Sequence, residues 1–276
     1  MEMTFPPAIN PKVALAMIDR FLVEELTKTG LGGFVVGLSG GIDSALSCAL
    51  AVHAVGKDSV LALKMPYRTS SPSSESDADE LIEKLGVKTE KIAITPVVDG
   101  YFADSPDITP LRRGNFCARA RMACIFDISA REKTLVLGTS NKTELLLGYG
   151  TWYGDVASSL NPIGDLYKTQ VRQLARFLDI PKAILEKPPS ADLWPDQTDE
   201  DELGLSYAEA DAILYRLVDE RFTIDEVAAA GFERALVERV LRMVERSQFK
   251  RRLPLIAKLS QRTIGIDFRY PRDWGR

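Results

Sequence analysis

Two serines, two glycines and an aspartate follow one another closely between Gly37 and Ser44, in the sequence GLSGGIDS. Glycines let a backbone turn tightly and approach an anion, because no Cβ stands in the way. A helix that begins here would offer unpaired N–H groups, and Ser39 and Ser44 would add hydroxyl donors. Asp43 can hold a cation that bridges phosphate oxygens. The segment is therefore predicted to bind nucleotide phosphates through Gly37, Leu38, Ser39, Gly40, Gly41, Ile42, Asp43 and Ser44.

This segment differs from the common nucleotide-binding signatures. The chain contains no G-x-x-x-x-G-K-[ST], which excludes a Walker-type NTPase. Gly148-Tyr-Gly150 has two glycines of a dinucleotide fingerprint but does not follow the strand pattern that the fingerprint requires. A glycine-rich turn capped by Asp43 is the structural alternative, and it does not explain why serines flank the glycines on both sides.

Short apolar runs alternate with amphipathic stretches around this segment. Strands are predicted at 34–38, 60–65, 91–95 and 134–137, and helices over 13–26, 45–52, 71–85 and 113–131. Strands separated by helices at this spacing form βαβ units, and therefore a parallel sheet covered on both faces. The predicted fold class is α/β, a Rossmann-like parallel sheet flanked by helices. Ligands of such sheets bind outside the carboxyl ends of the strands.

The second half of the chain is predicted to be less regular. Two long loops, 148–165 and 187–205, lie on either side of an amphipathic helix over 167–178, and loops of this length are usually functional or mobile. Ser206-x-x-Glu209 and Thr223-x-x-Glu226 are capping boxes that open two late helices. Residues 250–276 form a basic tail, and we expect one domain over 1–276.

S-G-G-x-D-S at a strand end resembles the pyrophosphate loop of the N-type ATP pyrophosphatases, which have the adenine nucleotide alpha hydrolase-like fold. Members of that superfamily cleave ATP between the α- and β-phosphates and adenylate an oxygen of their substrate. Further segments resemble the NAD synthetase family in particular, from about Val13 to Lys250. These segments are Gly114-Asn115-x-x-Ala118-Arg119-x-Arg121-Met122, Leu137-Gly-Thr-Ser-Asn-Lys-Thr-Glu144, Leu166-Tyr-Lys168-Thr-Gln, Lys187-Pro-Pro-Ser-Ala-Asp-Leu193 and Gln197-Thr-Asp-Glu-Asp-Glu-Leu-Gly-Leu-Ser-Tyr207.

The resemblance implies an ammonia-dependent ligase that adenylates the nicotinate carboxylate of deamido-NAD and then amidates it, as the last step of NAD biosynthesis. It implies Mg²⁺ held by Asp43 and Glu144, and catalytic roles for Asp43, Lys168 and Asp155, with Lys168 at the α-phosphate. Lys64, Thr139, Lys168 and Ser190 would contact ATP in addition to the glycine–serine loop. The residues expected to contact deamido-NAD are Asn115, Arg119, Arg121, Asp155 and Lys250, with Arg121 a weaker candidate than Arg119. Each charge also has a structural alternative, as a helix-surface arginine or lysine or as a first-turn acid.

The first long loop departs from the ammonia-dependent pattern T-K-[YF]-G-D-G-G-x-D. Trp152 replaces its lysine and Ser159 its last aspartate, while Asp155 is retained. T-x-Y-G-D is closer to the branch whose chains carry a glutaminase domain. No such domain is expected here, so the nitrogen would come from free ammonia or from a separate glutaminase partner. The family is homodimeric with deamido-NAD near the subunit interface, and the same is expected of this chain.

Composition limits the alternatives. The net charge of −4 argues against a general nucleic-acid binder, and no apolar run approaches the roughly 20 residues that span a bilayer. The chain is expected to be cytoplasmic, and Cys117 and Cys124 are expected to be small apolar core residues on one face of a helix. Another ATP pyrophosphatase, acting on a different carboxylate, a purine or a tRNA base, is the enzymatic alternative. A nucleotide sensor without turnover is the non-enzymatic one, although it would not need Asp43, Glu144 and Lys168 together.

Overall fold

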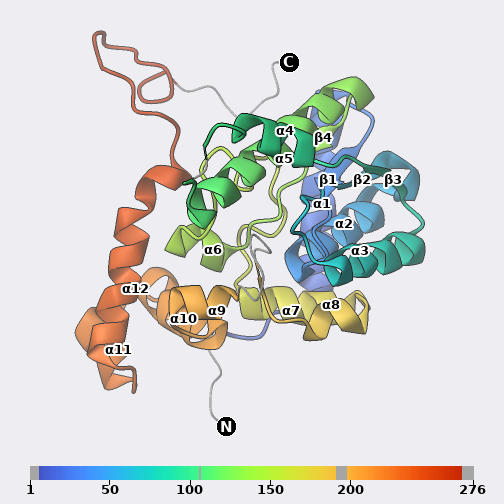
Figure 1. The fold of residues 1–276 in the computed structure, drawn as a ribbon. Helices are drawn as coiled ribbons and strands as arrows, with labels where there is room; N and C mark the ends of the chain where they lie inside the picture. The colour runs from blue at the N-terminus through green and yellow to red at the C-terminus, as the bar shows by residue number, and fades with distance from the viewer. Residues whose placement is uncertain (1–5, 106, 191–197, 269–276) are drawn as a thin grey trace.

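A computed structural model describes residues 6–105, 107–190 and 198–268 of the chain. The predicted fold class is confirmed, because four parallel strands form one sheet in the order β3-β2-β1-β4 (Figure 1). The strands are β1 (Phe34–Gly37), β2 (Val60–Lys64), β3 (Lys88–Lys91) and β4 (Leu135–Val136). The strand order reverses next to β1, so the segments after β1 and β4 meet at one edge of the sheet.

Helices connect and cover the strands. Those of the sheet half are α1 (Pro11–Thr29), α2 (Ile42–Val55), α3 (Pro72–Leu85), α4 (Thr95–Tyr101), α5 (Pro110–Glu132), α6 (Lys142–Leu147), α7 (Lys168–Phe177) and α8 (Lys182–Glu186). The later ones are α9 (Asp199–Leu203), α10 (Tyr207–Leu214), α11 (Ile224–Ala229) and α12 (Arg234–Arg246). Single turns of other helix types are η1 (Lys57–Ser59), η2 (Tyr215–Asp219) and η3 (Gln248–Arg251).

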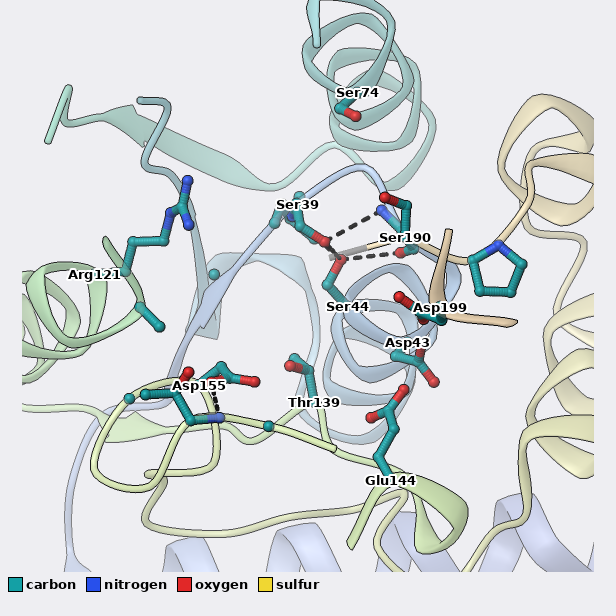
Figure 2. A pocket seen from close by; sticks show the side chains of 18 of the residues that line it. Ser39, Asp43, Ser44, Ser74, Arg121, Thr139, Glu144, Asp155, Ser190 and Asp199 are labelled. Carbon is teal, nitrogen blue, oxygen red and sulfur yellow. Dashed lines mark hydrogen bonds between the residues drawn. The ribbon is translucent and has the colours of Figure 1, made fainter. Parts of the chain in front are cut away.

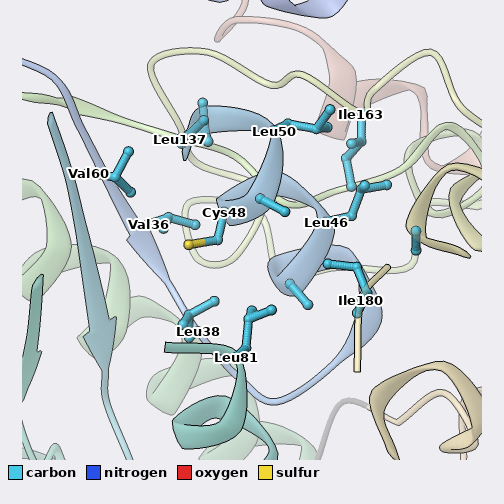
Figure 3. Packing of buried hydrophobic residues seen from close by; sticks show 14 of the residues in the cluster. Val36, Leu38, Leu46, Cys48, Leu50, Val60, Leu81, Leu137, Ile163 and Ile180 are labelled. Carbon is cyan, nitrogen blue, oxygen red and sulfur yellow. The ribbon is translucent and has the colours of Figure 1, made fainter. Parts of the chain in front are cut away.

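Alternation along β1 divides the core into two layers. Phe34 and Val36 face α1, α2 and α7, in the cluster that Figure 3 shows around Leu46 and Leu50 of α2. Val35 faces the other way, against Ile125 and Ile128 of α5. Successive side chains of a strand point to opposite faces, so the burial of Phe34, Val35 and Val36 shows that the sheet is covered on both sides.

The helices after the second long loop pack as a separate cluster. Tyr207, Ile213, Val237 and Val240 form its centre, with Leu147 of α6 among the buried members. The capping boxes predicted at Ser206 and Thr223 open α10 and α11. Within the described ranges no helix combines the length and the apolar composition needed to cross a membrane.

Two predicted boundaries were wrong. The third strand lies at Lys88–Lys91 instead of 91–95, and Thr95 already belongs to α4. The strand is an edge strand whose polar residues pair with β2, whereas the apolar Ile94 is buried in the cluster with Val98. The predicted loop 187–205 contains α9, which Thr198 caps by accepting a hydrogen bond from the backbone N–H of Asp201. Residues 191–197 of that loop lie outside the described residues.

Candidate active site

A cavity of about 1210 Å³ opens at the carboxyl ends of β1, β2 and β4, where the fold class predicts a ligand. It brings together sixteen of the residues singled out in the sequence. These are Gly37, Leu38, Ser39, Gly41, Ile42, Asp43, Ser44, Lys64, Asn115, Arg121, Thr139, Glu144, Asp155, Lys168, Ser190 and Lys250. Gly40 and Arg119 are absent from its wall.

The glycine–serine loop is held in a defined conformation at the N-terminus of α2. Gly40 has φ +78°, and a Cβ there would overlap the carbonyl oxygen of Ser74 on α3. The hydroxyl groups of Ser39 and Ser44 lie 3.1 Å apart, and Ser39 Oγ accepts a hydrogen bond from Gly41 N at 3.2 Å (Figure 2). Gly41 is the N-cap of α2 and provides no side-chain cap. The loop therefore presents hydroxyls and uncapped helix N–H groups to the cavity, as an anion site requires.

Two carboxylates and one ammonium group form the charged centre of the cavity. Lys168 Nζ donates to Asp43 Oδ2 at 2.5 Å and to Glu144 Oε1 at 3.2 Å, and the lysine side chain is only 3% exposed. Asp43 comes from the start of α2, Glu144 from α6 and Lys168 from the first residue of α7. Three elements far apart in the sequence therefore bring these charges to one point.

Asn141 orients this centre, a role that the sequence did not reveal. Its side chain caps α6 by accepting from Glu144 N, and Glu144 Oε2 accepts from Asn141 N in return. Asn141 Nδ2 also donates to Asp43 Oδ1 at 2.9 Å. The capping pattern Asn-x-x-Glu was visible at 141–144, and it marked a helix start without showing that the cap reaches Asp43.

Burial and neighbouring charge shift the acidity of the centre. Burial, with a smaller contribution from the charge of Asp43, raises the pKa of Glu144 to about 8. The carboxylates of Asp43 and Glu144 raise the pKa of Lys168 above its usual range, and they outweigh the opposite effect of its burial. Lys168 therefore stays charged in the folded protein and neutralises part of the acidic pair.

A third carboxylate, the buried Asp199, lies near Lys168 and was not among the site residues predicted from the sequence. Asp199 accepts hydrogen bonds from Tyr149 Oη at 2.9 Å and from Tyr207 Oη at 3.0 Å. Lys168 Nζ lies 4.9 Å from the centre of the Tyr207 ring. Burial raises the pKa of Asp199, and Lys168 opposes that rise. The two tyrosines and Asp199 therefore fix the wall against which Lys168 packs.

The other end of the cavity is built by the first long loop and α5. Asp155 is enclosed by protein yet exposed to the cavity, and this enclosure raises its pKa. Its Oδ1 accepts a hydrogen bond from Thr151 N at 2.7 Å, and Thr151 Oγ1 donates to Asn115 Oδ1 at 2.7 Å. Lys250 Nζ donates to the carbonyl oxygens of Gly148 and Gly150, both at 2.7 Å. The loop is therefore tied to α5 on one side and to η3 on the other.

Arg119 and Arg121, the two predicted arginines of α5, differ in whether they line the cavity. Arg121 lines the cavity and donates to Met65 O at 3.0 Å, whereas Arg119 is exposed and lies outside the cavity.

The two replaced positions of the first long loop are Trp152 and Ser159. Trp152 stacks on Tyr153 and meets Phe249 edge to face. Ser159 donates from its backbone to Val136 O and accepts from Val136 N, at the end of β4. Neither replacement lines the cavity of one chain.

The donor set suits a hard divalent cation that is shared with a ligand. No group of three or more His, Cys, Asp or Glu side chains that could hold a metal ion occurs in residues 6–105, 107–190 and 198–268. Asp43 and Glu144 supply two carboxylates, and Mg²⁺ is commonly bound by one or two carboxylates together with substrate phosphates. The pair therefore fits a cation that arrives with a polyphosphate.

A sequence model of the NAD synthase family matches residues 14–254. Over 268 residues the chain is 57% identical to a protein of Trichlorobacter lovleyi named NH(3)-dependent NAD(+) synthetase, covering 97% of this chain and 98% of that protein. The chain belongs to the NAD synthase family. The resemblance seen in the sequence motifs is thereby confirmed.

Solved structures of NAD synthases and related enzymes have the same architecture. The NH3-dependent NAD synthetase of Campylobacter jejuni superimposes with a TM-score of 0.77 at 34% identity, over 91% of this chain and all of that chain (100%). The NMN synthetase of Francisella tularensis gives a TM-score of 0.80 at 36% identity, over 90% of this chain and 99% of that chain.

Proposed function

We propose that the chain is the ligase that completes NAD. It uses ATP to adenylate the nicotinate carboxylate of deamido-NAD, then amidates it with ammonia and releases AMP and pyrophosphate. The observation that carries the proposal is the meeting of Asp43, Glu144 and Lys168 beside the glycine–serine loop in a single large cavity. The near full-length identity to a protein named for this reaction supports it.

The first step transfers AMP to the carboxylate. A carboxylate oxygen of deamido-NAD bonds to the α-phosphorus while the bond to the β-phosphate oxygen breaks, so that pyrophosphate leaves. Both reactants are anions, so positioning and charge neutralisation are the main requirements. Ser39, Ser44 and the N–H groups of the loop hold the phosphates, and Lys168 supplies positive charge at the α-phosphate. Lys64, Thr139 and Ser190 complete the ATP end of the cavity.

We assign Asp43 and Glu144 as the carboxylates that hold Mg²⁺. When bound, the ion would neutralise phosphate charge in this part of the cavity. Glu144 has to lose its proton to act as a ligand, and Lys168 already favours the charged form by its hydrogen bond.

The second step replaces AMP by nitrogen. Ammonia bonds to the activated carbonyl carbon, the bond to AMP breaks, and the nitrogen loses a proton. Asp155 is the group we assign to accept that proton, because enclosure raises its pKa and makes it a stronger base than a solvated aspartate. Asn115, Arg121 and Lys250 line the same end of the cavity and would bind deamido-NAD.

We further propose a homodimer in which deamido-NAD lies near the subunit interface. Arg119 is exposed on α5, so a role in binding requires a substrate that extends beyond the cavity of one chain. The same helix exposes Phe126, an apolar side chain that a second copy would cover.

The proposal is tested by measuring NAD formation from deamido-NAD, ATP and Mg²⁺ with either ammonium or glutamine as the nitrogen source. Formation with ammonium and none with glutamine is the expected result. Nicotinate mononucleotide is tested in parallel, because one structural neighbour is an NMN synthetase. No amide product from either nucleotide with ammonium would refute the proposal. Product from the mononucleotide alone would retain the ligase chemistry and correct the substrate.

A further inference from the structure

Residues 252–268 leave the body of the molecule as an apolar and basic arm. Every residue of this arm is exposed except Thr263, and Leu255 and Leu259 are 93% and 94% exposed. Figure 1 shows the arm rising past the end of α12 into the upper part of the view. Exposed apolar side chains gathered on one segment mark an interaction site, because monomeric proteins rarely leave large apolar patches in water.

The described part of its own chain gives the arm little support. Residues 253–259 make no backbone hydrogen bond to any described residue. The tip is folded locally, since Lys258 pairs with Asp267 and Arg262 stacks over Phe268. Seven residues span at most about 23 Å when fully extended, which is the distance over which the arm could carry this tip from η3.

A surface of complementary character lies on α4 and the start of α5. Val97 and Leu111 are exposed there, and Tyr101 is 64% exposed while it stacks on Phe116 at 4.3 Å. Residues 97–111 contain three Asp and no Lys or Arg, and the arm, residues 252–268, contains three Lys or Arg and one Asp. Asp104 and Asp107 are exposed beside the apolar side chains. We name this surface, made of Val97, Tyr101, Asp104, Asp107 and Leu111, the α4–α5 face.

We propose that the arm of one copy docks on the α4–α5 face of a second copy, and that the exchange is reciprocal. This inference deepens the proposed homodimer and rests on that part of the proposed function. A two-fold dimer uses the same patches on both copies, so each copy would donate one arm and receive one. In Figure 1 the arm rises at the upper left, and α4 and α5 lie in the upper middle of the view.

The docked arm would also connect the dimer to the active site. Its base at η3 contains Lys250, whose ammonium holds the carbonyl oxygens of Gly148 and Gly150 at the cavity wall. Leu111 of the α4–α5 face lines the cavity as well. Docking would therefore steady the cavity walls of both copies.

The test measures dimer dissociation of the full chain by sedimentation equilibrium. The arm variant Leu255→Ser/Leu259→Ser and the face variant Val97→Ser/Tyr101→Ser are each expected to raise the dissociation constant at least about 100-fold, because each removes apolar burial twice per dimer. The control Val13→Ser/Met17→Ser removes from α1 an apolar pair about as exposed as that of the face variant, and it is expected to leave the dissociation constant unchanged. Circular dichroism checks that all three variants fold.

Mixing the arm variant with the face variant gives a second, more specific measurement. A mixed dimer retains one intact arm–face contact, whereas each variant alone retains none, so mixing is expected to restore part of the association. Dimers of wild-type strength from both variants, or dissociation caused only by the α1 control, would overturn the inference. Loss of activity in the arm variant with no change in association would also overturn the inference, since the arm would then cover its own chain. Binding of the wild-type chain to anionic vesicles through the arm, with no role of the arm in association, would overturn it as well, since the arm would then cover a lipid surface. A wild-type chain that makes NAD as a monomer would refute the inference and the proposed homodimer, and would leave the proposed ligase activity standing.

Discussion

Gly40 is the residue whose replacement tests most directly how the phosphate loop is built. In Gly40→Ala the new Cβ must accept φ +78°, and left-handed backbone costs about 1–2 kcal/mol for a residue with a Cβ. The Cβ would also overlap the Ser74 carbonyl oxygen and lie 2.8 Å from its carbonyl carbon, and relieving such overpacking costs about 1–3 kcal/mol. The expected loss in the free energy of unfolding is therefore about 2–5 kcal/mol.

The matched control is Gly86→Ala at the end of α3. Gly86 has φ +65°, but the nearest atom to its Cβ is Lys57 Cδ at 3.4 Å, the end of a flexible side chain. Its expected loss is about 1–2 kcal/mol, from the backbone conformation alone. Urea unfolding of both variants isolates the contact with Ser74. We also expect the KM for ATP to rise in Gly40→Ala and to stay constant in Gly86→Ala.

Two results would refute this reasoning. Equal losses of stability in the two variants would mean that the close approach of the loop to α3 does not affect the free energy of unfolding. A wild-type KM for ATP in a destabilised Gly40→Ala would mean that the loop does not bind the phosphates.

Three further predictions concern the charged groups of the cavity. Lys168→Met should lower the free energy of unfolding at pH 9 by about 3–5 kcal/mol, because it leaves two buried carboxylates without their partner. The more exposed pair broken by Lys142→Met should cost less in the same urea titration, and equal losses would contradict the burial argument. Burial raises the pKa of Glu144 to about 8, so its contribution to metal-free stability is complete below its unfolded pKa and is lost as the pH rises through about 8. Glu144→Gln should flatten that part of a thermal-unfolding profile, and an unchanged slope would show that another group titrates. Arg121→Ala should raise the KM for deamido-NAD in any association state, whereas Arg119→Ala should do so only in the dimer, and steady-state kinetics across a protein dilution series separates the two.

The local sequence was sufficient to predict the structure where one short segment determines both the backbone conformation and the chemistry of its side chains. The glycines and serines of 37–44 predicted a strand-to-helix turn with anion donors, and the structure places that turn at the end of β1. The alternation of apolar runs gave the parallel sheet. The third strand was misplaced because an edge strand needs few apolar residues, and Ile94 is buried for a different reason.

Contacts between segments that are distant along the chain could not be predicted from the sequence. Nothing near Asn141 indicates that its amide reaches Asp43, which is 98 residues away. Asp199 lies in a stretch whose prolines and acids predicted a loop, and only the folded chain shows that two tyrosines hold it beside Lys168. Arg119 and Arg121 are two positions apart on one helix and so point to different sides, but the sequence did not show which of them faces the cavity.

The ion pairs of Lys168 imply that the protein itself supplies a counter-ion to the two carboxylates of the cavity. One ammonium shared by two carboxylates leaves a net charge of at most −1 at the centre, and protonation of Glu144 removes even that. A tetra-anionic nucleotide therefore approaches a charged centre that is nearly neutral overall instead of one with two uncompensated negative charges. If Asp43 and Glu144 hold a metal ion as proposed, that ion would take the place of Lys168 at the two carboxylates, and the ammonium group would be free to turn toward the nucleotide. Under the proposed metal assignment, metal binding and the release of Lys168 to the α-phosphate would be a single exchange of partners.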